Sequence, residues 1–308
     1  MTNAPMYKLA PSGTTVQNAQ NGTLSPNMTQ PKNPDAGTKD RKIAETVENG
    51  SVPKRKILPK IRSETNPLPT PIKVNKLTPL LDAYDEKDFV IDGFSQGFDL
   101  GYEGDQLSQR CNNNLSVNMN IEAAMQKVQK EVALKRIAGP FEAPPLEHFK
   151  CSPLSLREKS TPGQFRLLHN LSYPHDDTAV NANIPDHKAK TTYSNIDDAL
   201  DDIRLYDSPY LAKTDIADAF RLLLLKPACY NLTGFKLKGE YYYDCCVPMG
   251  ASSSCLTFER VSDSLVHIIK NKYKVKHVTK VLDDFLFIAE TKRNVNGLLT
   301  PSLNWRRK

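Results

Sequence analysis

Two adjacent aspartates, Asp283 and Asp284, interrupt an apolar, strand-like run from Val281 to Ile288. Unpaired carboxylates between apolar neighbours are costly to remove from water, so an ordinary core strand has no use for them. A divalent metal ion offsets that cost, because Mg²⁺ prefers carboxylate oxygens and keeps room for phosphates. The alternative is a tight hairpin that places both aspartates in a solvated turn. The run therefore predicts either a metal site or a hairpin.

A third aspartate lies in a similar setting upstream. The segment Tyr210–Asp215 reads as a strand that ends on a carboxylate, and Ile216–Phe220 follows as a tight, partly helical turn. Three carboxylates on two neighbouring strand ends can hold two metal ions about 4 Å apart, the arrangement used for phosphoryl transfer. The alternative for Asp215 is a helix N-cap, a position that aspartate often fills.

Lys159 and Arg166 flank the turn sequence Ser160–Gly163. We expect them on opposite arms of a β-hairpin. Cations placed in this way can converge on a triphosphate, Arg166 through its planar fork and Lys159 as a point charge. The alternative is a pair of solvated surface charges.

Gly250 precedes a run of small residues, Ala251–Cys255, and then an amphipathic segment. Glycine permits close backbone approach, and hydroxyls at a helix start offer caps and donors to a nucleic-acid backbone. The apolar residues expected on or near one face of the helix are Leu256, Phe258, Val261, Leu265 and Ile268.

Four segments between Thr70 and Leu299 together resemble the fingers and palm of a reverse transcriptase, most closely the type found in DIRS-like (tyrosine-recombinase) retrotransposons. Phe165–Pro174 is similar to the fingers motif and Ala212–Arg221 to the first palm motif. The other two are Val247–Ser252, similar to the motif that braces template and nucleotide, and Leu282–Phe285, similar to the paired-aspartate motif. Their order and spacing make the signal specific.

The resemblance implies an RNA-directed DNA polymerase that adds dNTPs to a primer 3′-OH. Asp215, Asp283 and Asp284 would be its catalytic residues and would hold two Mg²⁺ ions, or Mn²⁺. Lys159 and Arg166 would bind the nucleotide's phosphates. The implied partners are an RNA template, a DNA primer and dNTPs.

The resemblance also implies contacts to the nucleotide's base and sugar. Phe220, five residues after Asp215, would exclude a ribose 2′-OH, although a core phenylalanine is an equally good chemical reading. Met249 and Gly250 would lie against the nucleotide, with Met249 where many retroviral enzymes carry glutamine. Val281 replaces the aromatic residue usual before the paired aspartates.

The mixture of helical and strand-like periodicity predicts an α+β fold, with an antiparallel sheet packed on helices. We expect helices over Asn120–Lys135, from Ser194 with Asp197 in a capping-box-like place, and after Gly250. Further expectations are a short helix around Leu77–Tyr84, an extended piece at Phe89–Ile91, and strands at Leu222–Leu225, Leu232–Lys238 and Tyr241–Val247, the last two joined by a hairpin turn.

The expected organisation is a disordered basic tail over 1–69, an irregular lead-in over 70–118, incomplete reverse transcriptase fingers and palm over 119–299, and a divergent tail over 300–308. Residues 1–70 carry ten Lys and Arg against five Asp and Glu, so they hold +5 of the net charge of +6. Nine of the 22 prolines also lie in the tail. A chain this poor in apolar surface cannot offset its ordering entropy.

Composition favours an intracellular protein, in the nucleus or cytoplasm. The six cysteines show no zinc-type spacing and indicate reduced thiols. No apolar run of about 18 residues occurs, so we expect no membrane contact. The basic cluster Pro53–Lys56 is a short candidate for a nuclear import signal.

Only 24 residues follow Asp284, which is too few for the remaining palm and the thumb of such a polymerase. We therefore expect the thumb to be absent, with a second polypeptide as a possible source of a thumb or RNase H. Two other functions stay open: an inactive retroelement remnant that binds nucleic acid or a protein partner, and a metal-dependent hydrolase.

Overall fold

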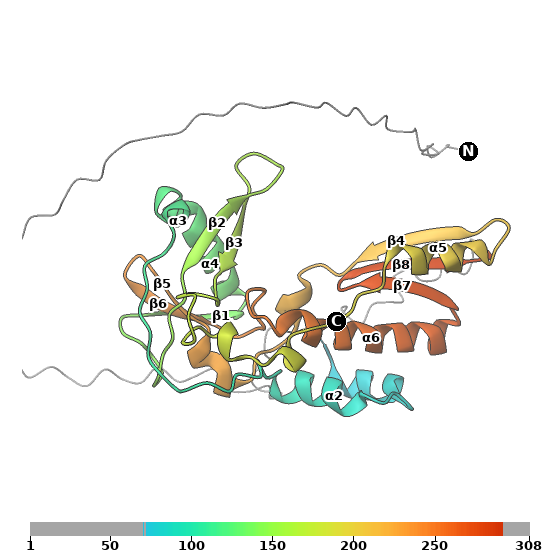
Figure 1. Cartoon of the computed structure of the whole chain (residues 1–308), viewed down its shortest axis with the longest axis horizontal. Helices are drawn as coiled ribbons and strands as arrows, with labels where there is room; N and C mark the ends of the chain where they lie inside the picture. Colours follow the sequence, from blue (N-terminus) through green and yellow to red (C-terminus); the bar gives the residue numbers. More distant parts are fainter. Residues whose placement is uncertain (1–69, 71, 292–308) are drawn as a thin grey trace, which may run out of the picture. The chain divides into compact units, whose positions relative to one another are not determined.

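The computed structural model describes Thr70 and residues 72–291, which form a mixed α+β fold (Figure 1). Its helices are α1 (Val74–Leu77), α2 (Lys87–Gln96), α3 (Leu115–Met119), α4 (Ile121–Ala133), α5 (Ile196–Arg204) and α6 (Ser254–Tyr273). Short 3₁₀ helices are η1 (Thr78–Leu81), η2 (Asn181–Asn183), η3 (Asp186–Lys188), η4 (Ala219–Leu222) and η5 (Pro227–Leu232). The expected tails over 1–69 and 300–308, and the cluster Pro53–Lys56, lie outside the described residues.

The strands of the described residues form three antiparallel sheets, which confirms the expected fold class. The sheets have the orders β1-β6-β5, β2-β3 and β4-β8-β7. The strands are β1 (Ile137–Phe141), β2 (Leu154–Glu158), β3 (Phe165–His169), β4 (Tyr210–Asp215), β5 (Gly234–Leu237), β6 (Glu240–Asp244), β7 (His277–Val281) and β8 (Asp284–Ala289).

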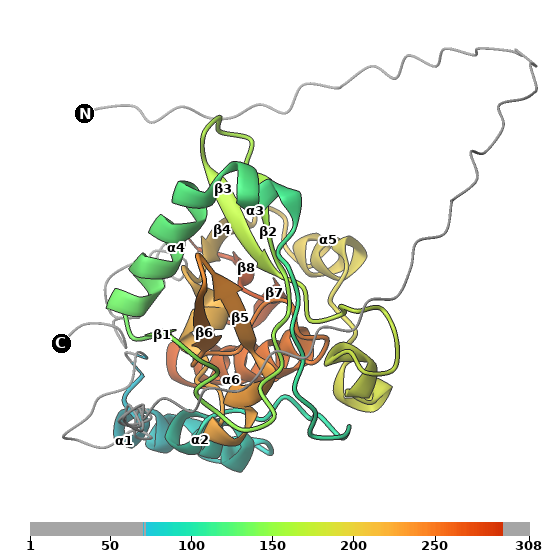
Figure 2. The same cartoon turned by 90° about the vertical axis from the view of Figure 1, so that its left-hand side faces the viewer.

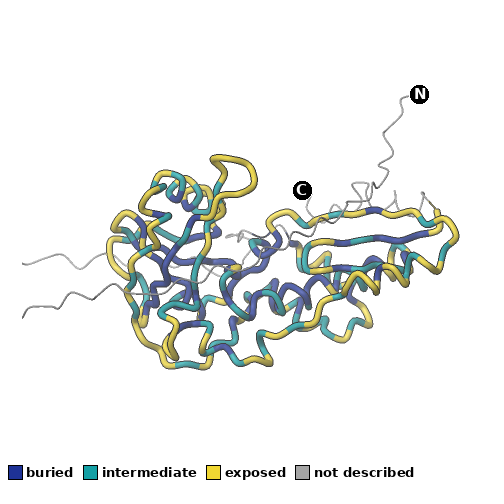
Figure 3. The backbone as a smooth tube through the Cα atoms, turned by 45° about the horizontal axis from the view of Figure 1, so that its top comes forward, coloured by how far each residue is buried: buried dark blue, intermediate teal, exposed yellow. Residues whose placement is uncertain are grey.

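The β4-β8-β7 sheet packs one face against α6 (Figure 1). Ala212 of β4 pairs with Phe287 of β8, and both are buried together with Ile269 of α6. Burying a large apolar side chain contributes about 1.5–3 kcal/mol, so this face anchors the sheet. The buried residues, dark blue in Figure 3, run through the strands and one side of α6. The next residue of β8, Ile288, faces the opposite side, where α5 lies.

The segment before α3 contributes to the main core. Val90 and Phe94 of α2 are buried, and Phe98 follows them into the same cluster. The expectation that Phe89–Ile91 is extended is wrong, because these residues lie inside α2. Buried positions at Val90, Gly93 and Phe94 have helical spacing, which a short run of apolar residues does not reveal by itself.

Helix α5 begins later than Ser194. Asn195 is its N-cap, and its side chain accepts hydrogen bonds from the backbone N–H groups of Asp197 and Asp198. The capping-box carboxylate is therefore Asp198, which accepts a hydrogen bond from the N–H of Asn195, rather than Asp197. The expected box is present but is displaced by one residue.

The other expected elements occur with changed limits. The helix predicted over Asn120–Lys135 is α4, preceded by the short α3. Strands β5 and β6 are shorter than predicted, and both turn residues between them, Lys238 and Gly239, have positive φ, as a type I′ turn requires. Leu222–Leu225 is not a strand, because η4 takes its first residue and only isolated bridges follow.

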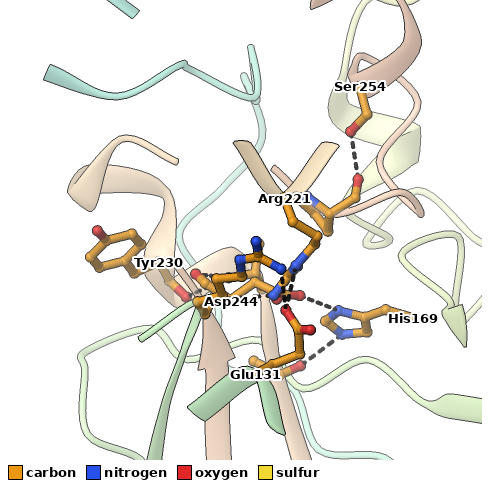
Figure 4. Close-up of polar contacts among 10 residues, drawn as sticks. Glu131, His169, Arg221, Tyr230, Asp244 and Ser254 are labelled. Carbon is orange, nitrogen blue, oxygen red and sulfur yellow. Dashed lines mark hydrogen bonds and ion pairs between the residues drawn. The ribbon is translucent and has the colours of Figure 1, made fainter. Parts of the chain in front are cut away.

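A buried ionic network joins four elements of the fold, η4, β6, α4 and β3 (Figure 4). Arg221 of η4 donates to Asp244 of β6 at 2.7 Å and to Glu131 of α4 at 3.0 Å. The Nδ1 atom of His169, at the end of β3, lies 3.5 Å from the other oxygen of Asp244. Burial alone would raise the pKa of Asp244, but Arg221 and His169 hold it below its usual range.

No helix among the described residues has the length and apolar character needed to cross a membrane.

Replacing Asp244 with asparagine should destabilise the fold, because Arg221 would keep its charge in a buried site with one counter-ion fewer. We expect Asp244→Asn to lower the free energy of unfolding by about 3 kcal/mol, measured by urea unfolding followed by circular dichroism. The matched control is Asp201→Asn, which breaks an exposed pair with Arg204 and should cost under about 1 kcal/mol. Equal effects of the two substitutions would contradict a structural role for the network.

Candidate functional site

The three predicted acids lie at one end of the β4-β8-β7 sheet. Strand β4 ends at Asp215 and β8 begins at Asp284, and these two residues are direct antiparallel partners. Asp283 lies in the two-residue turn between β7 and β8, after Leu282. The run from Val281 to Ile288 therefore forms a hairpin, and the turn of that hairpin brings Asp283 and Asp284 to the end of β4, where Asp215 lies.

Asp215 and Asp283 are neighbours at the end of the sheet. The backbone N–H of Ile216, the residue after Asp215, donates to the carbonyl oxygen of Asp283 at 3.0 Å. Burial raises the pKa of Asp283, and the neighbouring charges of Asp215 and Asp284 add to that shift.

Asp284 has a different partner. Its carboxylate forms an ion pair with Lys213 of β4, with Nζ and Oδ1 3.0 Å apart. Within the described residues, no three His, Cys, Asp or Glu side chains are grouped closely enough to hold a metal ion. Both side chains of the pair are largely exposed, 68% and 52%, and such pairs contribute at most about 1 kcal/mol. A stronger ligand can therefore displace Lys213 at small cost.

Lys159 and Arg166 lie on the β2–β3 hairpin, in the arrangement expected from the sequence. The N–H of Lys159 donates to the carbonyl oxygen of Gln164 at 2.7 Å and closes the loop. Arg166 stands directly opposite Arg157, and all three cationic residues are exposed. The hairpin therefore presents a cationic face, on a sheet separate from the one that carries the acids; α4 packs against its other side (Figure 2).

Phe220 belongs to the main core. It is 8% exposed and packs against Phe258 of α6, with ring centroids 5.2 Å apart. These are the contacts of a core residue, the alternative that the sequence left open. Its role in excluding a ribose 2′-OH stays a prediction.

Met249 and Gly250 lie in the loop before α6. Met249 is 62% exposed. At Gly250, a Cβ atom would lie 1.9 Å from the carbonyl oxygen of His169, so any larger residue would displace one of the two backbones. The close approach expected at Gly250 is therefore made to the end of β3.

Two site residues were not found from the sequence. Lys213, two residues before Asp215, shares its face of β4, a relation that strand periodicity could have shown. Asn181 braces the loop before α6: its amide donates to the carbonyl oxygen of Gly250 at 2.9 Å and accepts from the N–H of Ser252 at 2.9 Å. Those partners are some 70 residues away in sequence, and no local pattern indicates them.

A cavity of about 470 Å³ lies beside Asp215, between α6 and the buried face of the β4-β8-β7 sheet. Its walls are mainly leucine, isoleucine and phenylalanine side chains, including Leu222, Phe258 and Phe285. Three lysines, Lys73, Lys76 and Lys272, also line it.

No protein-family model matches the sequence, and no curated protein matches it. Among solved structures, the chain is similar to the native prototype foamy virus protease–reverse transcriptase, with 16% identity and a TM-score of 0.47 over 65% of this chain and 24% of that chain. It is also similar to a foamy viral protease–reverse transcriptase in complex with dsDNA, with 15% identity and a TM-score of 0.48 over 67% of this chain and 38% of that chain. This chain therefore spans between a quarter and two fifths of those proteins, and the similarity assigns it no activity.

The raised pKa of Asp283 predicts how the stability of the metal-free protein depends on pH. A carboxyl group whose pKa is higher in the folded state contributes stability below its unfolded pKa, about 3.9, and loses it as the pH rises through the folded pKa. Asp283→Asn should therefore be more stable than wild type at neutral pH, and the difference should vanish in acid. Thermal unfolding in EDTA across a pH series measures it.

The matched control for this experiment is again Asp201→Asn. It removes a carboxylate from an exposed ion pair and should give no stabilisation at any pH. If the wild type were at least as stable as Asp283→Asn at neutral pH, the ionised Asp283 would not be destabilised by burial and by its neighbouring carboxylates.

Proposed function

We propose that this chain carries the fingers and palm of an RNA-directed DNA polymerase of a DIRS-like retrotransposon. Its reaction would be transfer of a nucleotide from a dNTP to a primer 3′-OH. One observation carries the proposal: Asp215 and Asp284 are paired at a sheet end, and Asp283 contacts Asp215 from the adjoining turn. A purely structural sheet end gains nothing from three carboxylates that repel one another.

The residues at this sheet end fit divalent cations by their chemistry. Carboxylate oxygens are the ligands that Mg²⁺ and Mn²⁺ prefer. Asp215 and Asp283 would hold the ions, and Asp284 would join them on leaving Lys213. When bound, two Mg²⁺ ions would stabilise the attacking and leaving oxygens of the transfer.

The cationic hairpin is suited to the other end of the substrate. Lys159 and Arg166 are exposed and have no ion-pair partner among the described residues, so they are available to a triphosphate. Arg166 would engage two phosphate oxygens through its planar fork, and Lys159 would add a point charge. Met249 and Gly250 would lie against the nucleotide, and Phe220 would set the space left for the sugar.

The proposed partners are an RNA template and a DNA primer. One of the similar foamy viral proteins was solved in complex with dsDNA, and for this chain the corresponding ligand would be a primer–template duplex. A second polypeptide would supply a thumb or RNase H. The proposal places the protein inside the cell, in the nucleus or cytoplasm.

One observation favours a second candidate, a retroelement remnant that binds nucleic acid or a protein without catalysis. Asp284 is held by Lys213, and within the described residues the acids are not assembled as a group of three. If the ion pair persists with substrate present, the exposed hairpin cations could still bind a nucleic-acid backbone.

Primer extension tests the proposal. The 308-residue chain should extend a DNA primer on an RNA template with dNTPs and Mg²⁺. Asp283→Asn should lower the rate at least about 100-fold, because it removes charge that the reaction needs. Asp201→Asn, the exposed control on α5, should keep the wild-type rate.

The outcomes separate the candidates. Undiminished extension by Asp283→Asn would exclude the proposed site. A folded wild-type chain that binds the primer–template duplex without extending it would support the remnant.

A further inference from the structure

Glu259 of α6 is a buried carboxylate directly beneath the turn that carries Asp283. It is 7% exposed, and both of its oxygens have partners. Oε1 accepts from Lys280 of β7, with the nitrogen 2.5 Å away, and Oε2 accepts from the backbone N–H of Leu282 at 3.1 Å. One side chain therefore contacts both a strand of the hairpin and its turn.

Leu282 needs such support. Its φ of 53° lies in the left-handed region, which costs a non-glycine residue on the order of 1–3 kcal/mol. Val281 and Asp284 pair across the turn, and the N–H of Leu282 has its hydrogen bond to Glu259 instead of to the strand ladder. A partly buried N–H without a partner would add a further cost. The Glu259 carboxylate thus favours the turn geometry that sets the direction of Asp283.

Lys280 keeps Glu259 in place. It is 6% exposed, and its Nζ also lies 3.0 Å from Asp263, one turn further along α6. A lone buried carboxylate would be unstable as an anion, and the lysine supplies the opposite charge at hydrogen-bonding distance. The ion pair contacts neither Asp215 nor the hairpin cations, so its effect on the site passes through Leu282.

We propose that Glu259, oriented by Lys280, is a positioning residue for the acid site: its hydrogen bond to Leu282 fixes the turn that holds Asp283 against Asp215. This inference rests on the proposed polymerase function for its catalytic consequence. Its structural part, the restraint of the turn, stands independently of catalysis.

A pair of double variants isolates the hydrogen bond from the buried charges. Glu259→Gln with Lys280→Met removes both charges and leaves an oxygen that can accept from Leu282. Glu259→Leu with Lys280→Met removes the charges and the acceptor at similar volume. Replacing both members avoids a lone buried charge, and apolar replacement of a buried ion pair is often tolerated, so we expect both proteins to fold.

The hydrogen-bond acceptor at position 259 should determine the rate of primer extension. Relative to the glutamine variant, the leucine variant should lose about 10–100-fold in kcat and need a higher Mg²⁺ concentration for half-maximal rate, the usual effect of losing a group that orients a metal ligand. The KM for dNTP should stay within about twofold, because the hairpin cations are untouched. Loss of global stability alone would not lower kcat and raise the Mg²⁺ requirement while leaving the KM for dNTP unchanged.

A matched control uses another ion pair made by α6. Arg260 pairs with Glu86 at 2.8 Å and stacks on Phe89, away from the turn. Glu86→Gln breaks this pair without touching Leu282 and should leave kcat and the Mg²⁺ requirement unchanged.

Hydrogen exchange of the Leu282 amide, followed by NMR, tests the restraint without catalysis. Exchange should be faster in the leucine variant than in the glutamine variant. Faster exchange in a chain whose wild type does not extend primers would support the restraint and count against the polymerase proposal. Equal exchange and equal kinetics in the two folded variants would overturn the role of Glu259.

Discussion

The antiparallel pairing of β4 with β8 is the constraint on which the rest of the site depends. Its register sets Asp215 opposite Asp284 and puts Ala212 opposite Phe287 on the alternate face. A shift of one residue would turn the carboxylates toward α6 and the apolar side chains toward solvent. The packing that buries Phe285 and Phe287 therefore also holds the acids on the outer face. The alternation of side chains between the two faces of the sheet therefore serves both the packing of the core and the placement of the acids.

Charge is handled differently in two regions of the protein. Around Asp244, every buried charge has an opposite partner, and the pKa of that carboxyl is lowered. Around Asp283, negative charges gather at the sheet end and the pKa is raised. The first arrangement is that of a structural network, and the second is typical of a site that awaits a cation or a proton. This contrast is the physical reason for proposing a function at the sheet end.

Local patterns predicted the elements whose neighbours are close in sequence. Strand Tyr210–Asp215 has the predicted limits, and the helix after Gly250 and the hairpin between Lys159 and Arg166 are present. Phe89–Ile91 was mistaken for an extended segment, because three apolar residues fit a strand or one face of a helix equally well.

Contacts between distant residues were beyond such patterns. Two examples are the hydrogen bond between Asn181 and Gly250 and the hydrogen bond between Glu259 and Leu282. Both depend on how α6 and the loop before it pack in the fold. From the sequence, Glu259 is one more charged residue in an amphipathic helix. The pairing of Asp284 with Lys213 needs the register as well as the periodicity.

Arg221 and His169 share the carboxylate of Asp244, and this arrangement affects how the protein unfolds. Arg221 and His169 approach the carboxylate from η4 and from the end of β3, while Asp244 itself belongs to β6 (Figure 4). If η4 or β6 detaches, the buried ion pair between Arg221 and Asp244 is broken. The cost of separating that pair favours opening of η4 and β6 together, as one cooperative unit. The exposed hairpin tip beyond Glu158 takes no part in this network.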